Sequence, residues 1–191
     1  VSVLVNTGTG TFAAKVDYDA GSSPWSVALG DVNGDGKPDV VVANSASATV
    51  SVLVNSGTGT FAAKVDYPTE GTPRSVALGD VDGDGKPDLV VANSSSNSVS
   101  VLVNSGTGTF AAKVDYPTGT TPSSVALGDV DGDGKRDLVV ANLGSHTVSV
   151  LVNLGTGTFA PKVDYPTGTN PQSVALGDVD GDGKRDLVVA N

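Results

Sequence analysis

Residues 79–93 read GDVDGDGKPDLVVAN, an acidic and glycine-rich segment that runs directly into a short apolar stretch. The same segment returns with few changes at residues 30–44, 128–142 and 177–191. The chain of 191 residues therefore consists of three repeats of 49 residues and a fourth of 44. A period of this length is typical of a propeller blade and is too long for a leucine-rich repeat. Because the repeat covers the whole sequence, we expect residues 1–191 to form a single domain.

Each repeat is predicted to form four short strands. In the second repeat these are residues 75–81, 88–93, 99–104 and 110–116, which are rich in β-branched residues and separated by Gly, Pro, Asn and Ser. Residues 88–93 form the kind of continuous apolar run that is buried on both faces of a sheet. No window has the 3.6-residue period of a helix. We therefore predict an all-β fold, a β-propeller of four-stranded antiparallel blades with four blades per chain.

The predicted blades are residues 26–67, 75–116 and 124–165, with a closing blade formed by residues 173–191 together with residues 1–18. The closing blade can join within one chain, which gives a four-bladed ring. It can also join between two chains, which gives a homodimer with an eight-bladed ring and twofold symmetry. A third alternative is a fragment of a longer array. We favour the dimer, because a blade whose packing suits seven blades adapts more readily to eight than to four.

The loop between the first two strands of each repeat has the pattern D-V-[DN]-G-D-G-K-[PR]-D. Of the 21 Asp and Glu residues in the chain, 15 lie in these four loops. Carboxylates this close repel one another unless a cation neutralises them, and the glycines allow the loop to curl around one. Calcium suits such a site because it takes 6–8 oxygen ligands with flexible geometry.

We therefore predict Ca²⁺ as a cofactor, about one ion per repeat and four per chain. The predicted ligands are Asp31, Asn33, Asp35, Lys37 and Asp39; Asp80, Asp82, Asp84, Lys86 and Asp88; Asp129, Asp131, Asp133, Lys135 and Asp137; and Asp178, Asp180, Asp182, Lys184 and Asp186, each Lys through its backbone carbonyl. The loop is not an EF-hand, because position 12 is Val where an EF-hand needs a bidentate Glu. Asn33 removes one charge from the first loop, which we expect to be the weakest site.

The loop, the following L-V-V-A-N or V-V-V-A-N strand and the later G-T-F turn resemble FG-GAP repeats of the VCBS type over all 191 residues. Such repeats are similar to those of the integrin alpha-subunit propeller, of bacterial secreted proteins and of some fungal lectins. The resemblance implies a propeller that binds calcium in one hairpin loop of each blade. Propellers of this kind usually have seven blades, whereas only four repeats are present here.

The loops on the face opposite the acidic loops differ from repeat to repeat. The most divergent position is occupied by Trp25, Arg74, Ser123 and Gln172, which we identify as a possible ligand face. Trp and Arg are typical anchors for a protein partner or a sugar ring. Neutral variation of solvent-exposed loops would give the same pattern, and Trp25 could equally pack between blades.

Composition excludes several classes of function. A net charge of −10 argues against nucleic acid as a partner, and no apolar stretch is long enough for insertion into a membrane. With one His and no Cys, no catalytic constellation is evident, so we do not expect an enzyme. The sequence predicts a calcium-binding scaffold for adhesion or for carbohydrate or protein recognition. The alternative is a purely structural repeat or a self-assembling spacer without its own ligand. Weak calcium sites of this type point to an extracellular or cell-surface location.

Overall fold

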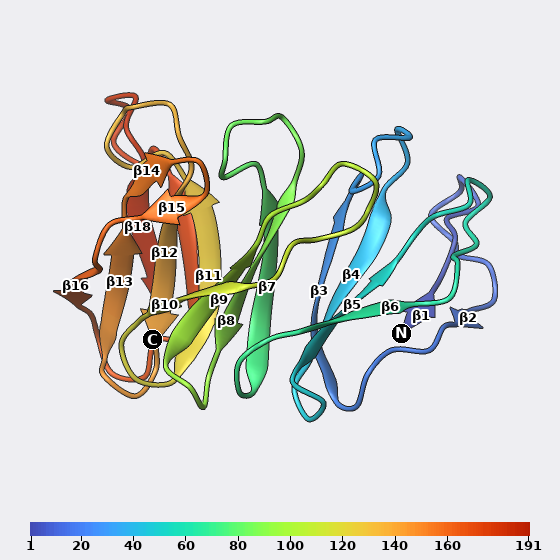
Figure 1. Ribbon diagram of the computed structural model, residues 1–191, viewed down its shortest axis with the longest axis horizontal. Coiled ribbons are helices and arrows are strands. Elements are labelled where there is room, and N and C mark those ends of the chain that lie inside the picture. Colours follow the sequence, from blue (N-terminus) through green and yellow to red (C-terminus); the bar gives the residue numbers. More distant parts are fainter.

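The computed structural model describes residues 1–191, and its regular elements are all β-strands (Figure 1). Three four-stranded antiparallel sheets follow one another along an open arc, in agreement with the predicted blades. No helix in the structure is long and apolar enough to span a lipid bilayer.

The strands fall into three complete blades and two half-blades. Blade 1 contains β3 (Pro24–Gly30), β4 (Asp39–Asn44), β5 (Thr49–Leu53) and β6 (Val65–Pro68). Blade 2 contains β7 (Pro73–Gly79), β8 (Asp88–Asn93), β9 (Ser98–Leu102) and β10 (Val114–Pro117). Blade 3 contains β11 (Pro122–Gly128), β12 (Asp137–Asn142), β13 (Thr147–Leu151) and β16 (Val163–Pro166), with the small hairpin of β14 (Asn153–Gly155) and β15 (Thr158–Phe159). The N-terminal half-blade is β1 (Ser2–Val3) and β2 (Val16–Asp17), and the C-terminal half-blade is β17 (Ser173–Gly177) and β18 (Asp186–Ala190).

The second predicted strand of each repeat agrees closely with the structure, whereas the fourth is shorter than predicted. In blade 2 the fourth strand begins at Val114 and not at Phe110. Phe110 makes only an isolated bridge to Asn104, because its ring leaves the sheet and packs edge-to-face on Tyr67 of the preceding blade, with ring centroids 5.3 Å apart. Phe110, which the sequence pattern places in the fourth strand, therefore packs between two blades instead.

The apolar core lies between successive blades. Every residue of β8 is buried, because blade 1 covers one face of this strand and blade 3 covers the other. One apolar cluster joins Val41, Ala43 and Val52 of blade 1 to Leu89 and Val91 of blade 2. An equivalent cluster joins blade 2 to blade 3. We call each such contact between successive blades a seam.

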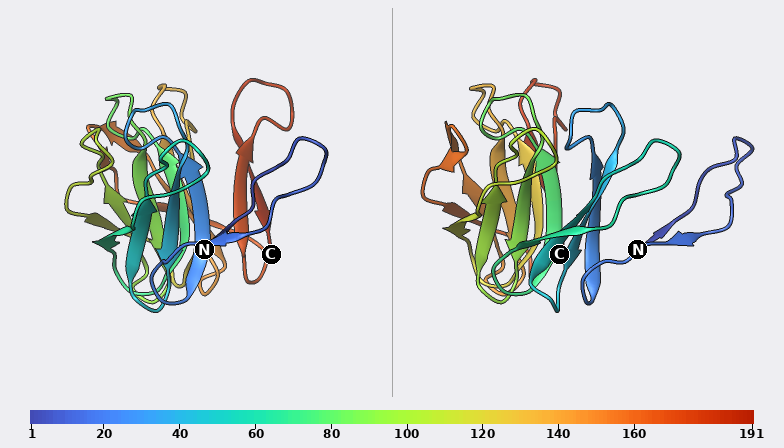
Figure 2. Two further views of the ribbon diagram at one scale, coloured as in Figure 1. Left: turned by 90° about the vertical axis from the view of Figure 1, so that its right-hand side faces the viewer. Right: turned by 45° about the vertical axis from the view of Figure 1, so that its right-hand side comes forward.

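The two halves of the predicted closing blade belong to separate sheets in this structure (Figure 2). Each half already has the register of the corresponding part of a complete blade. Ser2 lies opposite Asp17 in the N-terminal half-blade, just as Ser51 lies opposite Asp66 in blade 1. The C-terminal half-blade repeats the pairing of the first two strands of a blade, with Gly177 opposite Asp186. The chain is therefore an arc with a preformed half-blade at each end.

Candidate metal centre

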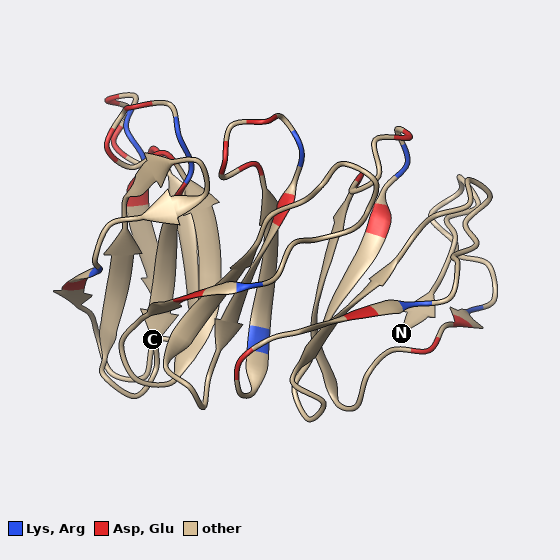
Figure 3. Ribbon diagram, in the orientation of Figure 1, with Lys and Arg blue, Asp and Glu red and all other residues tan.

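The four acidic loops connect the first two strands of their blades and lie along the same edge of successive blades, the upper edge in Figure 3, where acidic residues gather. Each loop turns tightly at two glycines with positive φ. In the second loop these are Gly83 (φ 84°) and Gly85 (φ 85°), a conformation that other residues rarely adopt. The glycines therefore let the loop curl back toward the start of the next strand.

Carboxylates at loop positions 1, 3 and 9 converge. In the second loop, ligand oxygens of Asp80, Asp82 and Asp88 lie within 4.8 Å of one another. The same grouping occurs for the third and fourth loops, with Asp129, Asp131 and Asp137, and with Asp178, Asp180 and Asp186. Two oxygens that share one Ca²⁺ ion can lie at most about 5 Å apart, so this donor set fits calcium.

Backbone N–H groups hold the first and ninth carboxylates in place. Asp80 accepts hydrogen bonds from the N–H groups of Gly83 (2.7 Å) and Gly85 (2.9 Å). Asp88 is fully buried and accepts one bond from Val81 and one from Asn104, both at 2.8 Å. These bonds fix the two ends of the loop and leave further lone pairs on the oxygens for a cation.

The carboxylate at position 5 of each loop does not join the carboxylates at positions 1, 3 and 9. In the first loop the Lys37 ammonium donates to Asp35 at 2.9 Å, and the backbone N–H of Lys37 donates to the same carboxylate. The corresponding pairs are Asp84 with Lys86, Asp133 with Lys135, and Asp182 with Lys184. The structure therefore brings together positions 1, 3 and 9 and places position 5 against the Lys side chain. The backbone carbonyl of that Lys remains a predicted ligand.

The pKa directions reflect this division of the loop. Burial, followed by the nearby charge of Asp82, raises the pKa of Asp88 above its usual value even though two backbone N–H groups lower it. Burial likewise raises the pKa of Asp137. By contrast, the hydrogen bond from Lys86 lowers the pKa of the Asp84 carboxyl. A divalent cation would therefore stabilise the charge of the buried position-9 carboxylates, Asp88 and Asp137, most strongly.

The first loop differs at position 3, where Asn33 replaces a carboxylate. The Asn33 amide oxygen accepts a hydrogen bond of 3.0 Å from the N–H of Asp35. Asp31 still binds the two loop glycines, and Asp39 still binds Val32 and Asn55. The loop therefore keeps its shape with one charge fewer, and its lower affinity stays a prediction.

An asparagine that sequence reasoning missed organises these loops from the neighbouring turn. Asn104 donates its backbone N–H to Asp88, and its side-chain amide donates to the carbonyls of Pro87 and Val32, both at 2.9 Å. Val32 belongs to the acidic loop of the preceding blade, so one residue ties two loops together. Its recurrence every 49 residues, directly before the glycine-rich turn, is the signal that could have identified it.

The four residues of the predicted ligand face occupy different environments. Trp25 is 61% exposed, and the Arg74 guanidinium lies 5.2 Å from the centre of its ring, so the two side chains stack across neighbouring blades. The Ser123 hydroxyl donates a hydrogen bond of 2.8 Å to the backbone carbonyl of Pro171. Gln172 is exposed and donates its backbone N–H to Ala190. Only Trp25 and Arg74 form a shared surface.

Comparison with known families gives one matching model. The model described as FG-GAP-like repeat matches residues 1–42, 31–91, 80–140 and 129–189. These overlapping matches include all four acidic loops. No curated protein sequence matches the chain.

Several solved structures share the fold. A lectin of Agrocybe aegerita that recognises non-reducing terminal N-acetylglucosamine is 23% identical, with a TM-score of 0.60 over 100% of this chain and 51% of the lectin. BBS1N, solved in complex with ARL6DN, is 19% identical, with a TM-score of 0.63 over 90% of this chain and 53% of that chain. Virginiamycin B lyase of Staphylococcus aureus is 13% identical, with a TM-score of 0.60 over 91% of this chain and 52% of that chain. The chain thus spans about half the length of each of these three proteins, and at these identities the likeness concerns the fold alone.

Proposed function

The chain belongs to the FG-GAP-like repeat family, and on that premise we propose that it is a calcium-binding β-propeller module, a rigid extracellular scaffold for adhesion or for carbohydrate or protein recognition. The observation that carries the proposal is the convergence of three carboxylates, within 4.8 Å, in three successive loops. Four Ca²⁺ ions would add eight positive charges to a chain whose formal net charge is −10. Bound calcium therefore makes the acidic end of the blades electrostatically tolerable.

The residues of each loop have separate roles in this proposal. Carboxylates at positions 1, 3 and 9 would hold the ion, together with the backbone carbonyl at position 7. Calcium supplies the positive charge that cross-links the start of the loop to the strand that follows it. The side-chain amides of Asn104 and Asn153 then connect the second and third loops to the preceding blade, so that loading one of these loops also stiffens a seam. Weak sites of this type fill at millimolar calcium, which supports a location outside the cell.

Isothermal titration with calcium tests the proposal directly. We expect about four ions per chain and a higher melting temperature in calcium than in excess EDTA. The triple variant Asp80→Asn, Asp129→Asn and Asp178→Asn should lose most of the binding. Asp17→Asn is the matched control, because Asp17 is an exposed aspartate outside the loops. No heat of binding, together with identical melts in calcium and EDTA, would refute the calcium proposal.

Recognition is assigned to the stacked pair of Trp25 and Arg74. An exposed indole beside a guanidinium can stack on a sugar ring and donate hydrogen bonds to it. The fold that the chain shares with a fungal lectin supports this assignment. A glycan array should show binding that Trp25→Ala abolishes and that Leu154→Ser preserves, since Leu154 is equally exposed and its counterparts in two other repeats are Ser. Glycan binding that survives Trp25→Ala would show that the binding site lies elsewhere on the protein.

A purely structural or self-assembling repeat is the second candidate. It is favoured by the unpaired strand edges of the two half-blades, which offer hydrogen-bonding groups to another chain. Absence of any glycan or protein ligand, combined with ordered self-association, would favour this alternative. In either case we expect binding and not catalysis, although one protein of the same fold is a lyase.

A further inference from the structure

Each internal seam is built on the same leucine–glycine contact. A Cβ atom on Gly30 would lie 2.9 Å from Cδ1 of Leu78, so the leucine of blade 2 occupies the space above the glycine of blade 1. The contact repeats at 2.8 Å between Gly79 and Leu127, and again between Gly128 and Leu176. Each blade therefore offers one glycine to the next blade and one leucine to the previous blade.

At the two ends of the arc, the halves of this contact are left apart. A Cβ atom on Gly177, in the C-terminal half-blade, would meet nothing within 4 Å. Leu29, in the first strand of blade 1, is 66% exposed. Its neighbour Val27 is 61% exposed, whereas the counterparts Val76 and Val125 are both 7% exposed. The vacant glycine and the uncovered leucine are the two parts of one more seam.

The asparagine tie shows the same division. Asn104 reaches the carbonyl of Val32 in the preceding blade at 2.9 Å, and Asn153 reaches Val81 at 2.8 Å. Asn55 is the corresponding residue of blade 1, and it binds only the carbonyl of Pro38 in its own blade. The valine left over at the other end is Val179, which is 69% exposed.

The aromatic pairs give a third, independent case. Tyr67 packs edge-to-face on Phe110 with ring centroids 5.3 Å apart, and the pairs Tyr18–Phe61 and Tyr116–Phe159 have the same spacing. The remaining tyrosine, Tyr165, lies near the C-terminal end and is 50% exposed. The remaining phenylalanine, Phe12, lies in the N-terminal hairpin and is 60% exposed.

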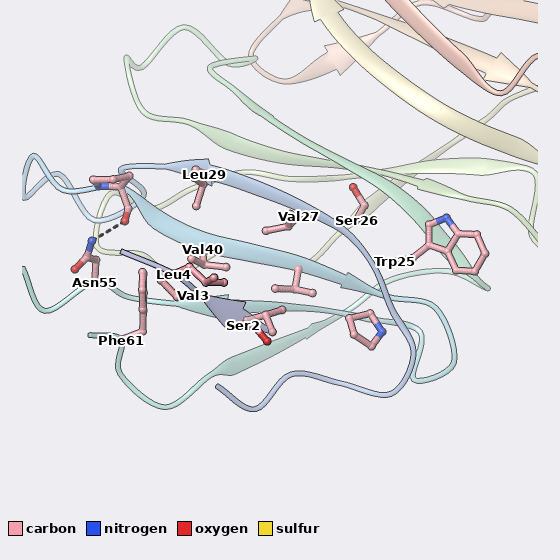
Figure 4. A pocket seen from close by; sticks show the side chains of 14 residues that line it. Ser2, Val3, Leu4, Trp25, Ser26, Val27, Leu29, Val40, Asn55 and Phe61 are labelled. Carbon is pink, nitrogen blue, oxygen red and sulfur yellow. Dashed lines mark hydrogen bonds between the residues drawn. The ribbon is translucent and has the colours of Figure 1, made fainter. Parts of the chain in front are cut away.

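The N-terminal end also contains a groove into which a strand pair can dock. The groove has a volume of about 600 Å³, and apolar residues of the first strand of blade 1 and of the N-terminal segment line it (Figure 4). They include Val1, Val3, Leu4, Val27 and Leu29. At the other end, Val188 of β18 is 52% exposed, whereas its counterparts in β8 and β12 are buried. An apolar slot and an apolar two-stranded ribbon therefore lie at opposite ends of one chain.

We propose that a second copy of this chain covers both ends, so that the C-terminal half-blade of each copy enters the groove of the other and two copies close one eight-bladed ring. Between blade 1 of one copy and the C-terminal half-blade of the other, Leu29 would lie over Gly177 and Asn55 would bind the carbonyl of Val179. Between the N-terminal half-blade and blade 3 of the other copy, Phe12 would pack on Tyr165. Strand β18 would pair with the N-terminal strand in the register of β12 and β13, which places Leu187 opposite Leu4, Val188 opposite Val3 and Ala190 opposite Val1.

Each end carries the halves of the contacts that the other end lacks, and the open arc keeps the two ends of one chain in separate sheets. These observations therefore favour a second copy over closure of one chain on itself. Contacts of this head-to-tail kind form a closed ring or an open filament, depending on geometry. Two copies give eight blades, within the range of four to eight that propellers use, whereas three would give twelve. The proposal does not depend on a glycan ligand, and calcium binding is measured separately.

Light scattering on the chain in saturating calcium tests the proposal. We expect a particle with twice the 18.9-kDa chain mass. Leu29→Asp and Gly177→Leu should each reduce the particle to the mass of one chain. The first change removes the leucine side chain from the contact, and the second fills the space above Gly177 that this leucine would occupy. Leu29 is mostly exposed and the space at the Cβ position of Gly177 is open, so neither change affects the buried core within one chain. Leu154→Asp is the control, since Leu154 is 64% exposed but lies away from the ends, and it should remain a dimer.

Mixing the two variants distinguishes head-to-tail closure from other dimers. The Leu29→Asp chain keeps an intact Gly177, and the Gly177→Leu chain keeps an intact Leu29, so a mixture can form one normal seam. We expect the dimer mass to return on mixing, although neither variant dimerises alone. A symmetric interface that uses the same patch twice would not be restored in this way.

A disulfide measures the register. The chain has no Cys, so Val3→Cys with Val188→Cys introduces the only thiols. Residues directly opposite in antiparallel strands have Cα atoms about 4.5–5.5 Å apart, which suits a disulfide. The double variant should form a covalent dimer on oxidation, whereas each single variant should not. A monomeric wild-type chain in calcium would overturn the second copy as the occupant. It would leave the other end of the same chain, or further repeats of a longer chain, in that role. A filament or larger ring would overturn closure by two copies.

Discussion

The seam between blades 1 and 2 and the open N-terminal end are built from the same sequence, yet they have opposite surfaces. The segment SVALG occurs at residues 26–30 and at residues 75–79. Val76, in the SVALG segment of blade 2, is 7% exposed because blade 1 covers it. Val27, in the SVALG segment of blade 1, is 61% exposed. The comparison teaches that each repeat encodes a contact surface, while burial depends on whether a neighbour is present.

The same contrast applies to the apolar clusters. The clusters at the two internal seams contain 10 and 9 buried residues. Those that join the half-blades to the arc contain 5 at the C-terminal end and 3 at the N-terminal end. Regions with few buried apolar contacts open at low free-energy cost, so we expect the ends to lose structure before the seams do.

Calcium removal is the change with the largest expected effect on this contrast. Each site filled at a hundredfold excess over its Kd stabilises the fold by about 2.7 kcal/mol, which corresponds to roughly 5–10 °C in Tm for a chain of this size. Removal of calcium from all four proposed sites should therefore have a larger effect than any single substitution. Scanning calorimetry in calcium and in EDTA measures the shift. Hydrogen exchange should show that the exposed fourth loop loses protection before the enclosed second loop. Superimposable melts would contradict the prediction.

The ninth-position aspartates give the next largest difference. Asp88→Ala leaves two buried backbone N–H groups without an acceptor and should cost about 2–5 kcal/mol. Asp186 accepts a bond only from Val179, in an exposed setting, so Asp186→Ala should cost clearly less. Denaturant unfolding in EDTA compares the two variants without the contribution of calcium. Equal losses would show that the contact with Asn104, which follows the third strand of the same blade and has no equivalent at Asp186, does not contribute to stability.

Trimming the two valines tests the contrast itself. Val76→Ala should destabilise the chain by about 1–2 kcal/mol at any protein concentration, because it removes buried methyl groups. Val27→Ala should change the stability of a dilute chain by less than about 0.5 kcal/mol. If the ends meet in a second copy, Val27→Ala should instead weaken dimerisation, which sedimentation at several concentrations measures. A concentration-independent loss for Val27→Ala would mean that this face is already covered within one chain.

The first loop offers a smaller test. Asn33→Asp restores the pattern of the other three loops and should raise calcium affinity at that site alone, by about tenfold or less for one added charge. Titration calorimetry should change from one weak site and three stronger ones to four similar sites. Four equal sites in the unmodified chain would contradict the assignment of the first loop as the weakest.

The smallest effect concerns pH. Burial raises the pKa of Asp66, but hydrogen bonds from Lys64 and Ser51 outweigh it, so the pKa is lowered below 3.8. Because the folded value is below the unfolded one, this carboxylate stabilises the fold above about pH 4, and its contribution disappears as pH falls through the folded pKa. Asp66→Asn should therefore lower Tm slightly at pH 7 and not at pH 2. Hydrogen bonds from Lys15 and Ser2 also lower the pKa of Asp17, but this carboxylate at the open end is exposed and solvent screens its interactions, so Asp17→Asn should have a smaller effect than Asp66→Asn.

Much of the fold follows from local patterns. The 49-residue period, the valine-rich strands and the turn residues predict four-stranded antiparallel blades, and the second strand of each blade falls where its apolar run indicates. The convergence of the carboxylates at positions 1, 3 and 9 can also be predicted from the sequence, because all three lie within one short loop. The sequence predicts position 5 as a further ligand, whereas the structure pairs its carboxylate with the Lys two residues later. The sequence pattern cannot distinguish the two, since a carboxylate two residues before a Lys can face either the ion or the ammonium.

By itself, the sequence determined the repeat, the all-β blades and the donor types of each loop, because these depend on neighbours within a few residues. Only the tertiary structure decided where Phe110 and Asn104 act, since their partners Tyr67 and Val32 belong to the preceding blade. It also decided which copy of an identical segment is buried and which is open. Identical residues have identical local preferences, so only the placement of neighbouring blades can distinguish Val76 from Val27.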